Sequence, residues 1–198
     1  MARRGESLFE PDVPEGFLYR ADFIPAAEEA ELVGEIGRVQ FAAFEMRGVV
    51  ARRRVAFYGS AYDRGPVETP PMPAFLMPLR AKIAGLAGVV PEAFAMALIN
   101  EYPPGAPIGW HRDAPQYDIV AGVSLLSSCR MLLRPYVRPA DQRAAPGTRR
   151  SATHQIALER RSAYVMAGPA RTAYEHHIPA VGELRYSVTF RTLRIAPV

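Results

Sequence analysis

His111 and Asp113 are separated by one residue in the segment IGWHRDAP. In an extended chain, residues two apart direct their side chains to the same side, so these two could hold one ion together. Neutral imidazole is a good ligand for first-row divalent metals and a carboxylate adds charge, but a metal site needs at least one more donor. The remaining histidines are His154, His176 and His177.

The third partner decides whether this pair is a metal site or an ordinary polar pair on the surface. The segment AYEHHIP contains His176 and His177 and has the character of a strand. It lies shortly before the last strand-like run of the chain, where a distal ligand is expected if the strands fold back on one another. Spacing leaves both histidines open as candidates.

The last strand-like run, ELRYSVTFRTLR, carries two arginines on one face. Alternation places Arg185, Ser187, Thr189 and Arg191 on one side, and Tyr186, Val188 and Phe190 on the other. A guanidinium is always charged and is costly to bury without an anion, so in a barrel interior this face would receive carboxylates. If the face lies in solvent, the arginines are simply hydrated.

A second polar strand face favours the interior interpretation. In AMALINEY, Asn100 and Tyr102 share one side with Met96 and Leu98. Two strands with polar residues among apolar ones are more typical of a lined pocket than of a solvated edge.

The elements that must position these residues are mostly strands. Six short runs separated by turn residues, with no helix-length segment between them, predict antiparallel β architecture, a sandwich or jelly roll. These runs are 93–102, 118–126, 129–136, 154–159, 162–168 and 183–194.

The part of the chain before these runs is expected to be different. Residues 25–37 and 73–88 have the pattern of helices that cover one outer face, and 47–65 that of a hairpin. The segment 138–150 is polar and rich in turn formers, and its role is open.

Length and composition fit one globular domain of 198 residues. A single cysteine, Cys129, excludes an internal disulfide and a thiolate metal cluster, so metal chemistry must use His and carboxylates. No run approaches the roughly 20 apolar residues of a membrane span, and the polar, acidic start is unlike a secretory signal. We therefore expect a cytoplasmic protein that does not enter membranes.

The net charge is a less specific guide to the partner of this protein. A net charge of +4 and a pI of about 9.5 suit a polyanionic partner. However, Lys82 is the only lysine, so the arginine bias also fits codon composition. Arginine doublets and triplets on a solvated face would have the same appearance.

Taken in order, NEYPPGAPIGWHRD, VAGVSLL, GPARTAYEHHIP and RYSVTFR resemble the AlkB family of Fe(II)/2-oxoglutarate-dependent dioxygenases. The resemblance covers residues 98–193. It implies a mainly β fold with flanking helices (α+β), namely a double-stranded β-helix or jelly roll. Residues 1–90 would form the N-terminal helices and a substrate lid, and residues 91–198 the jelly-roll core, within one domain.

The resemblance also implies roles for individual residues. His111, Asp113 and His176 would be the iron ligands, a facial triad that leaves positions for 2-oxoglutarate and O2. His176 is preferred over His177 because the family's ligand stands two residues before the isoleucine, here Ile178. The cosubstrate 2-oxoglutarate would contact five residues: Asn100, Tyr102, Arg185, Ser187 and Arg191. At position 187, close relatives often carry Asn in place of Ser.

The activity that the resemblance implies is oxidative demethylation or dealkylation of bases in single-stranded DNA or RNA, releasing succinate, CO2 and formaldehyde. We expect a monomer. Arg53, Phe57, Tyr58 and Trp110 are the candidate substrate contacts. Pro115 departs from the family pattern, since nucleic-acid repair members have an acidic residue there.

Three alternatives remain open at this point. The same oxygenase chemistry could act on a protein side chain or a small molecule, as Pro115 suggests. The chain could be a non-catalytic jelly-roll binding protein, if the His-Asp pair lacks a third ligand. A zinc hydrolase could use the same three ligands, although the arginine face would then have no role.

Overall fold

The computed structural model describes residues 13–46, 48–60, 69–138 and 153–194. Two antiparallel sheets dominate these segments, as expected for a jelly roll. The major sheet has seven strands in the order β1-β9-β6-β11-β4-β3-β2, and the minor sheet has four in the order β5-β10-β7-β8. The predicted fold class is confirmed.

The strands of the major sheet come from both halves of the chain. They are β1 (Phe17–Arg20), β2 (Ala42–Met46), β3 (Val49–Gly59), β4 (Phe94–Tyr102), β6 (Tyr117–Leu125), β9 (Ala163–Met166) and β11 (Arg185–Leu193). The boundary expected near residue 90 does not divide this sheet, because β3 pairs with β4 along six residues and β2 pairs with β3.

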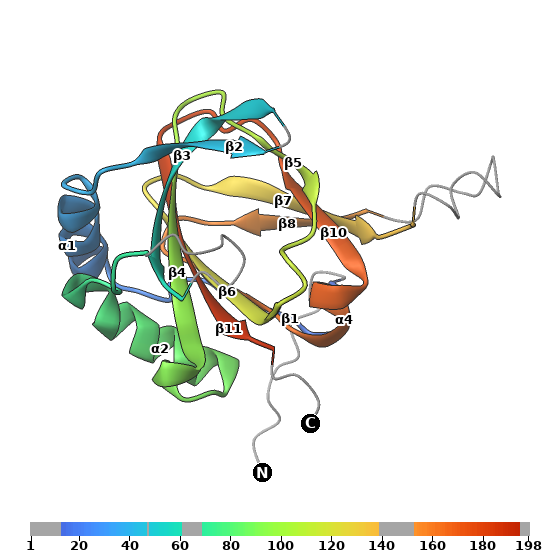
Figure 1. The fold of residues 1–198 in the computed structure, drawn as a ribbon, viewed down its shortest axis with the longest axis horizontal. Helices are drawn as coiled ribbons and strands as arrows, with labels where there is room; N and C mark the ends of the chain where they lie inside the picture. Colours follow the sequence, from blue (N-terminus) through green and yellow to red (C-terminus); the bar gives the residue numbers. More distant parts are fainter. Residues whose placement is uncertain (1–12, 47, 61–68, 139–152, 195–198) are drawn as a thin grey trace, which may run out of the picture.

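The minor sheet comes entirely from the second half of the chain. It consists of β5 (Ile108–His111), β7 (Cys129–Pro135), β8 (His154–Leu158) and β10 (Tyr174–Ile178). A short helix, α4 (Gly168–Thr172), leads into β10. Figure 1 shows this sheet on one side of the major sheet and the two longer helices on the other.

Helices α1 (Ala26–Ile36) and α2 (Met77–Ala87) cover the outer face of the major sheet, as the sequence predicts. A proline precedes α1, and two acids lie in its first turn, where the positive end of the helix dipole stabilises their negative charges. Gly88 ends α2 in the left-handed conformation, with φ of 70°. None of the helices in the described segments is long and apolar enough to cross a membrane.

Two apolar clusters hold the layers together. The first fills the space between the helices and the major sheet, and it includes Ile36, Leu79, Ile83, Val188 and Phe190. The second lies on the opposite face of the major sheet, toward the minor sheet. It includes Met96, Leu98, Val120, Met131 and Tyr164.

Several expectations about local structure need correction. The hairpin is not contained in 47–65: its first strand is β2, and β3 is a single strand of 11 residues. Strands β1 and β5 and helix α4, each of four or five residues, were not predicted. The segment 138–150 lies outside the described residues except for Arg138.

Gly122 makes room for an aromatic ring between the sheets. It pairs with Tyr164 of the neighbouring strand β9, and a Cβ placed on Gly122 would lie 2.5 Å from Cε1 of Tyr164. The ring of Tyr164 is 6% exposed and stacks on Phe17, with 6.0 Å between ring centroids. Only glycine leaves space for the ring in this position.

We therefore predict that Gly122→Ala lowers the free energy of unfolding by about 1 to 3 kcal/mol, the usual cost of overpacking. Gly34→Ala is the matched control, because Gly34 is exposed in α1 and an added Cβ meets nothing within 4 Å. That variant should gain about 0.5 to 1 kcal/mol. Urea unfolding measures both, and equal stability of the Gly122 variant and wild type would contradict the packing argument.

Candidate active site

A pocket of about 1000 Å³ opens between the two sheets. Strands β3, β4, β5, β6, β7, β10 and β11 and helix α4 all contribute side chains to its wall. Ten of the twelve residues singled out from the sequence lie on this wall: Arg53, Phe57, Asn100, Tyr102, Trp110, His111, Asp113, His176, Ser187 and Arg191. Arg185 and Tyr58 do not.

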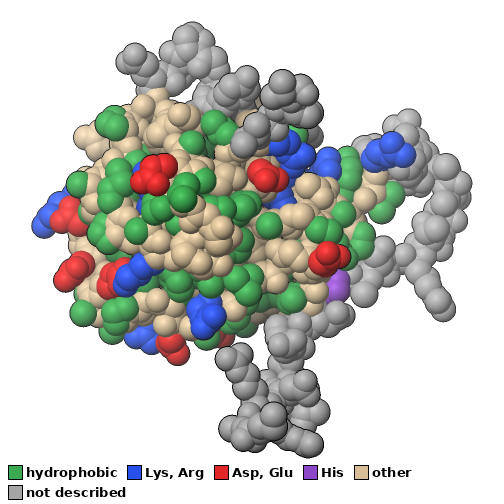
Figure 2. Space-filling model, turned by 90° about the horizontal axis from the view of Figure 1, so that it is seen from below, with side chains coloured by type: hydrophobic (Ala, Val, Ile, Leu, Met, Phe, Trp, Pro, Cys, Tyr) green, Lys and Arg blue, Asp and Glu red, His purple; other side chains and the backbone are tan. Residues whose placement is uncertain are grey.

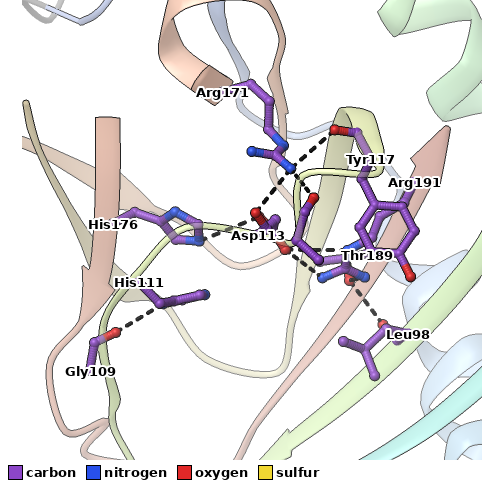
Figure 3. A network of polar contacts seen from close by, with 10 residues as sticks. Leu98, Gly109, His111, Asp113, Tyr117, Arg171, His176, Thr189 and Arg191 are labelled. Atoms are coloured by element: carbon purple, nitrogen blue, oxygen red, sulfur yellow. Dashed lines mark hydrogen bonds and ion pairs between the residues drawn. The ribbon is translucent and has the colours of Figure 1, made fainter. Parts of the chain in front are cut away.

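The three candidate metal ligands meet at one end of this pocket. His111 ends β5 and His176 lies directly opposite it in β10, with 4.2 Å between ring centroids. Asp113 follows β5, and its Oδ2 lies 3.8 Å from Nε2 of His176 (Figure 3). Residues separated by more than sixty positions are thus adjacent because β10 pairs with β5.

Asp113 is held with one oxygen engaged and the other without a partner. Its Oδ1 accepts hydrogen bonds from Nε and Nη2 of Arg191, at 3.3 and 3.0 Å. Its Oδ2 is buried and has no hydrogen-bond partner. Such an orphaned carboxylate oxygen beside two imidazoles is the arrangement that a metal cation would satisfy.

The charges around Asp113 keep it ionised. Burial by itself raises the pKa of this carboxyl, but the positive charge of Arg191, the largest of the opposing causes, outweighs burial and holds the pKa below its ordinary value. Asp113 is therefore a carboxylate at neutral pH.

His176 is kept neutral by the same environment. Burial, reinforced by His111, lowers the pKa of His176 to about 3, although Asp113 acts in the opposite direction. A neutral imidazole has a free lone pair, which is the form that binds a metal.

His111 is oriented by its own strand. Its Nδ1 lies 2.9 Å from the carbonyl oxygen of Gly109, which can only accept, so Nδ1 donates and Nε2 keeps the lone pair. Within the described segments, no three His, Cys, Asp or Glu side chains already surround a common point. A shared ion therefore requires side chains of this group to turn toward it.

His177 points away from this group. Its Nδ1 donates to the carbonyl oxygen of Ile108 at 2.5 Å, and its ring lies 5.2 Å from that of Trp110. This agrees with strand alternation, which puts neighbouring residues on opposite faces.

The polar faces of β4 and β11 are in register. Ser187 pairs with Asn100, and Arg185 pairs with Tyr102. On the other face of β11, Tyr186, Val188 and Phe190 belong to the core under the helices. The alternation predicted from the sequence is thus present, with the polar side toward the minor sheet.

Arg185 is the largest fully buried side chain in the described segments, with 0% exposure. Its Nε donates to Ser124 at 3.0 Å, while Nη1 and Nη2 have no hydrogen-bond partner. The guanidinium lies 5.1 Å from the ring centroid of Tyr102, which lines the pocket, whereas Arg185 does not reach the wall. A carboxylate that binds Arg185 must therefore lie beside Tyr102.

Tyr58, a predicted substrate contact, is on the wrong side of the sheet. It packs against the cluster under the helices, whereas Phe57 faces the pocket. Neighbouring residues of β3 alternate, so the two aromatics cannot share one cavity. Tyr58 is not retained as a substrate residue.

Arg171 in α4 is a site residue that sequence reasoning missed. It is 5% exposed, and its Nη2 donates to the carbonyl oxygens of Asp113, Ala114 and Tyr117, at 3.1, 2.5 and 3.1 Å (Figure 3). These bonds tie down the loop that follows Asp113. Only the three-dimensional contact reveals this, since nothing in the spacing of GPART distinguishes a buried arginine from an exposed one.

The fold and the site together define an oxygenase of the double-stranded β-helix class, and comparison with known proteins agrees. Residues 25–195 match the 2OG-Fe(II) oxygenase superfamily, so the chain belongs to it. It is accordingly a dioxygenase that requires Fe(II), 2-oxoglutarate and O2. Non-catalytic binding and zinc hydrolysis are not supported.

The similar proteins are AlkB-like. The chain is 26% identical over 187 residues to an Arabidopsis thaliana protein, "Alkylated DNA repair protein ALKBH8 homolog", a match that covers 86% of this chain and 52% of that protein. It is 25% identical over 181 residues to the Danio rerio "Probable RNA/DNA demethylase ALKBH6", covering 90% and 75%. The chain thus spans about half the length of the first relative.

Two solved structures share the fold. OsALKBH1 superposes with a TM-score of 0.63 at 13% identity, covering 94% of this chain and all of that one. A Pseudomonas putida prolyl-4-hydroxylase gives 0.62 at 15% identity, covering 91% and 94%. At this identity the likeness concerns the fold alone.

The lowered pKa of His176 predicts how stability depends on pH. The unfolded chain binds a proton near pH 6.5 and the folded chain near pH 3, so stability falls as pH decreases from 6.5 toward 3. One proton gives at most about 1.4 kcal/mol per pH unit. Asp113 adds its own loss only below about pH 4, because its unfolded value is 3.8.

Urea unfolding in EDTA between pH 6.5 and 4.5 tests this. The variant His176→Gln should lose less stability over this interval than wild type, because its residue 176 does not titrate. Parallel pH profiles for the two proteins would contradict the buried, neutral imidazole.

Proposed function

We propose that His111, Asp113 and His176 hold the Fe(II) ion that this family requires. The observation that carries this is the buried Oδ2 of Asp113, which lacks a partner and lies 3.8 Å from Nε2 of His176. When bound there with 2-oxoglutarate, iron would supply O2 activation coupled to oxidative decarboxylation of the cosubstrate. Three protein ligands leave room for both.

We assign the cosubstrate to the paired polar faces of β4 and β11. The unpartnered Nη atoms of Arg185 would receive the distal carboxylate of 2-oxoglutarate, with the Tyr102 hydroxyl as a second donor. Burial raises the pKa of Tyr102, so its phenol keeps the proton that it donates. Asn100, Ser187 and Arg191 lie along the pocket between Tyr102 and Asp113 and would contact the rest of the diacid.

The side chains around the candidate site have two further tasks. Arg191 keeps Asp113 ionised, and Arg171 fixes the loop that carries it. Apolar residues of the second cluster, such as Leu98, Val120 and Met131, line the pocket and exclude water from the reacting carbon.

We propose an alkylated base of single-stranded DNA or RNA as the substrate, to be demethylated with release of formaldehyde. The names of the two AlkB-like relatives support this, as does a pocket volume suited to a diacid and a base together. Trp110 and Phe57 offer aromatic surface on the wall.

Two aromatic rings of the pocket wall, those of Tyr136 and Trp110, have arginines stacked on them. The guanidinium carbon of Arg112 lies 3.6 Å from the ring centroid of Tyr136, and that of Arg134 lies 4.0 Å from that of Trp110. Such pairs suit a strand that offers phosphates and bases together. Figure 2 shows basic and acidic side chains mixed on the face that it presents, so the excess of arginine forms no broad basic surface there.

We predict that Asp113→Asn weakens iron binding by about 100-fold or more, because losing a charged ligand costs at least as much as losing a group that orients one. The matched control is Asp118→Asn. Asp118 is exposed on β6, and its Oδ1 lies 3.8 Å from Nη2 of Arg194. Anaerobic titration with Fe(II), followed by metal analysis, measures both variants. Unchanged iron binding in the first variant would reject the triad.

The substrate class is tested by turnover. The purified protein, given iron, ascorbate and 2-oxoglutarate, should release succinate and formaldehyde in equal amounts from an alkylated single-stranded oligonucleotide. Succinate formation without formaldehyde from any alkylated DNA or RNA would leave the oxygenase intact. The substrate would then be a protein side chain or a small molecule.

A further inference from the structure

The three consecutive arginines of β3 have three different environments. Arg52 is exposed and donates to the carbonyl oxygen of Gly105 at 3.3 Å. Arg54 is exposed and its Nη2 donates to Oε1 of Glu101 at 2.9 Å. Arg53 lies between them on the opposite face of the strand and lines the pocket. Only Arg53 is therefore placed to meet a ligand inside the pocket.

Arg53 is buried without a counter-ion. It is 9% exposed, and its Nη1 is buried with no hydrogen-bond partner. Its guanidinium carbon lies 4.0 Å from the ring centroid of Phe44, and Tyr102, Arg191 and Asp113 are near enough to act on its charge. A guanidinium has five N–H donors and no acceptor, so a buried one requires acceptor atoms from elsewhere.

The pocket itself has no carboxylate to spare. Its two lining acids are Asp113 and Glu175. Asp113 is paired with Arg191, and Glu175 accepts a bond from Arg134 at 2.5 Å. With the second oxygen of Asp113 committed to iron, an amino group of a ligand would find no free carboxylate, whereas an oxygen acceptor would find Arg53.

The balance of charge in the loaded pocket points the same way. Fe(II) and the 2-oxoglutarate dianion cancel each other, and Asp113 cancels Arg191. The pocket wall then keeps the positive charges of Arg53 and Arg171, besides the exposed Arg112 and Arg194, and Arg185 lies behind it. Of these, Arg171 is solvated by three carbonyls. A cationic substrate would be repelled there, because like charges at close range are costly.

Alkylated bases differ both in their charge and in whether they offer an oxygen acceptor next to the alkylated nitrogen. Thymine or uracil methylated at N3, and guanine methylated at N1, are neutral and carry a carbonyl oxygen at C4 of the pyrimidine or C6 of the purine, next to the alkylated nitrogen. Adenine methylated at N1 and cytosine methylated at N3 are cations at neutral pH and carry an amino group at C6 or C4 instead. The two classes therefore place opposite demands on the residue that meets this edge.

We propose that Arg53 determines base specificity: it donates to the carbonyl oxygen at C4 of a pyrimidine or C6 of a purine, beside the alkylated nitrogen, and selects neutral oxo-bases over cationic amino-bases. This inference rests on the proposed function, since it assumes that the substrate is a nucleic acid base. Arginine pairs with carbonyl oxygens of bases in the same way when it reads guanine in DNA.

The experiment compares four single-stranded oligonucleotides of one sequence, each with a single modified base: 3-methylthymine, 1-methylguanine, 1-methyladenine or 3-methylcytosine. Wild type should show a kcat/KM about tenfold or more higher for the two oxo-bases, the discrimination expected of one good arginine contact. In Arg53→Met the preference should be lost, with a lower rate on 3-methylthymine and a higher rate on 3-methylcytosine. Arg53→Gln, which keeps one donor without the charge, should fall between.

Two controls separate substrate recognition from other roles of Arg53. Arg52→Met removes the exposed neighbour and should retain the wild-type preference. The KM for 2-oxoglutarate in turnover without oligonucleotide is measured for Arg53→Met and wild type beside the base preference. An increased KM with an unchanged base preference would show that Arg53 binds the cosubstrate, and would overturn the proposal.

The remaining outcomes distinguish this inference from the function on which it rests. Faster turnover of 1-methyladenine and 3-methylcytosine by wild type would support base demethylation and overturn the role of Arg53. Equal turnover of all four bases would likewise support base demethylation and overturn the role of Arg53. Turnover of none of them, with succinate still formed, would overturn both proposals together.

Discussion

The candidate site depends on the way one buried carboxylate is held. Arg191 binds one oxygen of Asp113 and leaves the other without a partner, directed toward His176. Desolvation alone would favour the protonated acid, and the surrounding positive groups reverse this preference. The same burial keeps His176 unprotonated. An ionised acid and a neutral base thus lie side by side. Because both pKa values are lowered, this pair of protonation states persists to lower pH in the folded protein than in water.

The sheet architecture makes this arrangement possible. Strand β11 lies between β4 and β6, and every second residue contributes to a different layer. Val188 and Phe190 anchor the helices on one side. Arg185 and Arg191 on the other side hold the two ends of the polar site, so core packing fixes their separation. The pairing of β5 with β10 brings the histidines together in the same way.

Four arginines have three different roles around this pocket. Arg191 is paired with an acid, Arg171 binds backbone carbonyls, and Arg185 and Arg53 keep buried nitrogens without partners. An excess of arginine over acids on the surface would only favour polyanions in general. Buried guanidiniums that lack an anion are specific, because the ligand must supply the acceptors.

Much of this was determined by the sequence itself. Alternation in ELRYSVTFRTLR and AMALINEY predicts which side chains face the pocket, because a strand places neighbours on opposite faces whatever surrounds it. The short β runs likewise predict a jelly roll, and the motif order indicates its family. Local pattern is sufficient to predict which face a side chain takes, because that depends only on the geometry of one strand.

The tertiary structure decided the rest. It turned Tyr58 into the core and brought Arg171 to the loop after Asp113. The sequence predicted a hairpin within residues 47–65 and could not show that the partner strand of β3 is β2, which precedes that segment. It also could not show that β5 exists. Each of these depends on which distant segment lies alongside, and a pairing between segments far apart leaves no periodic signal in either one.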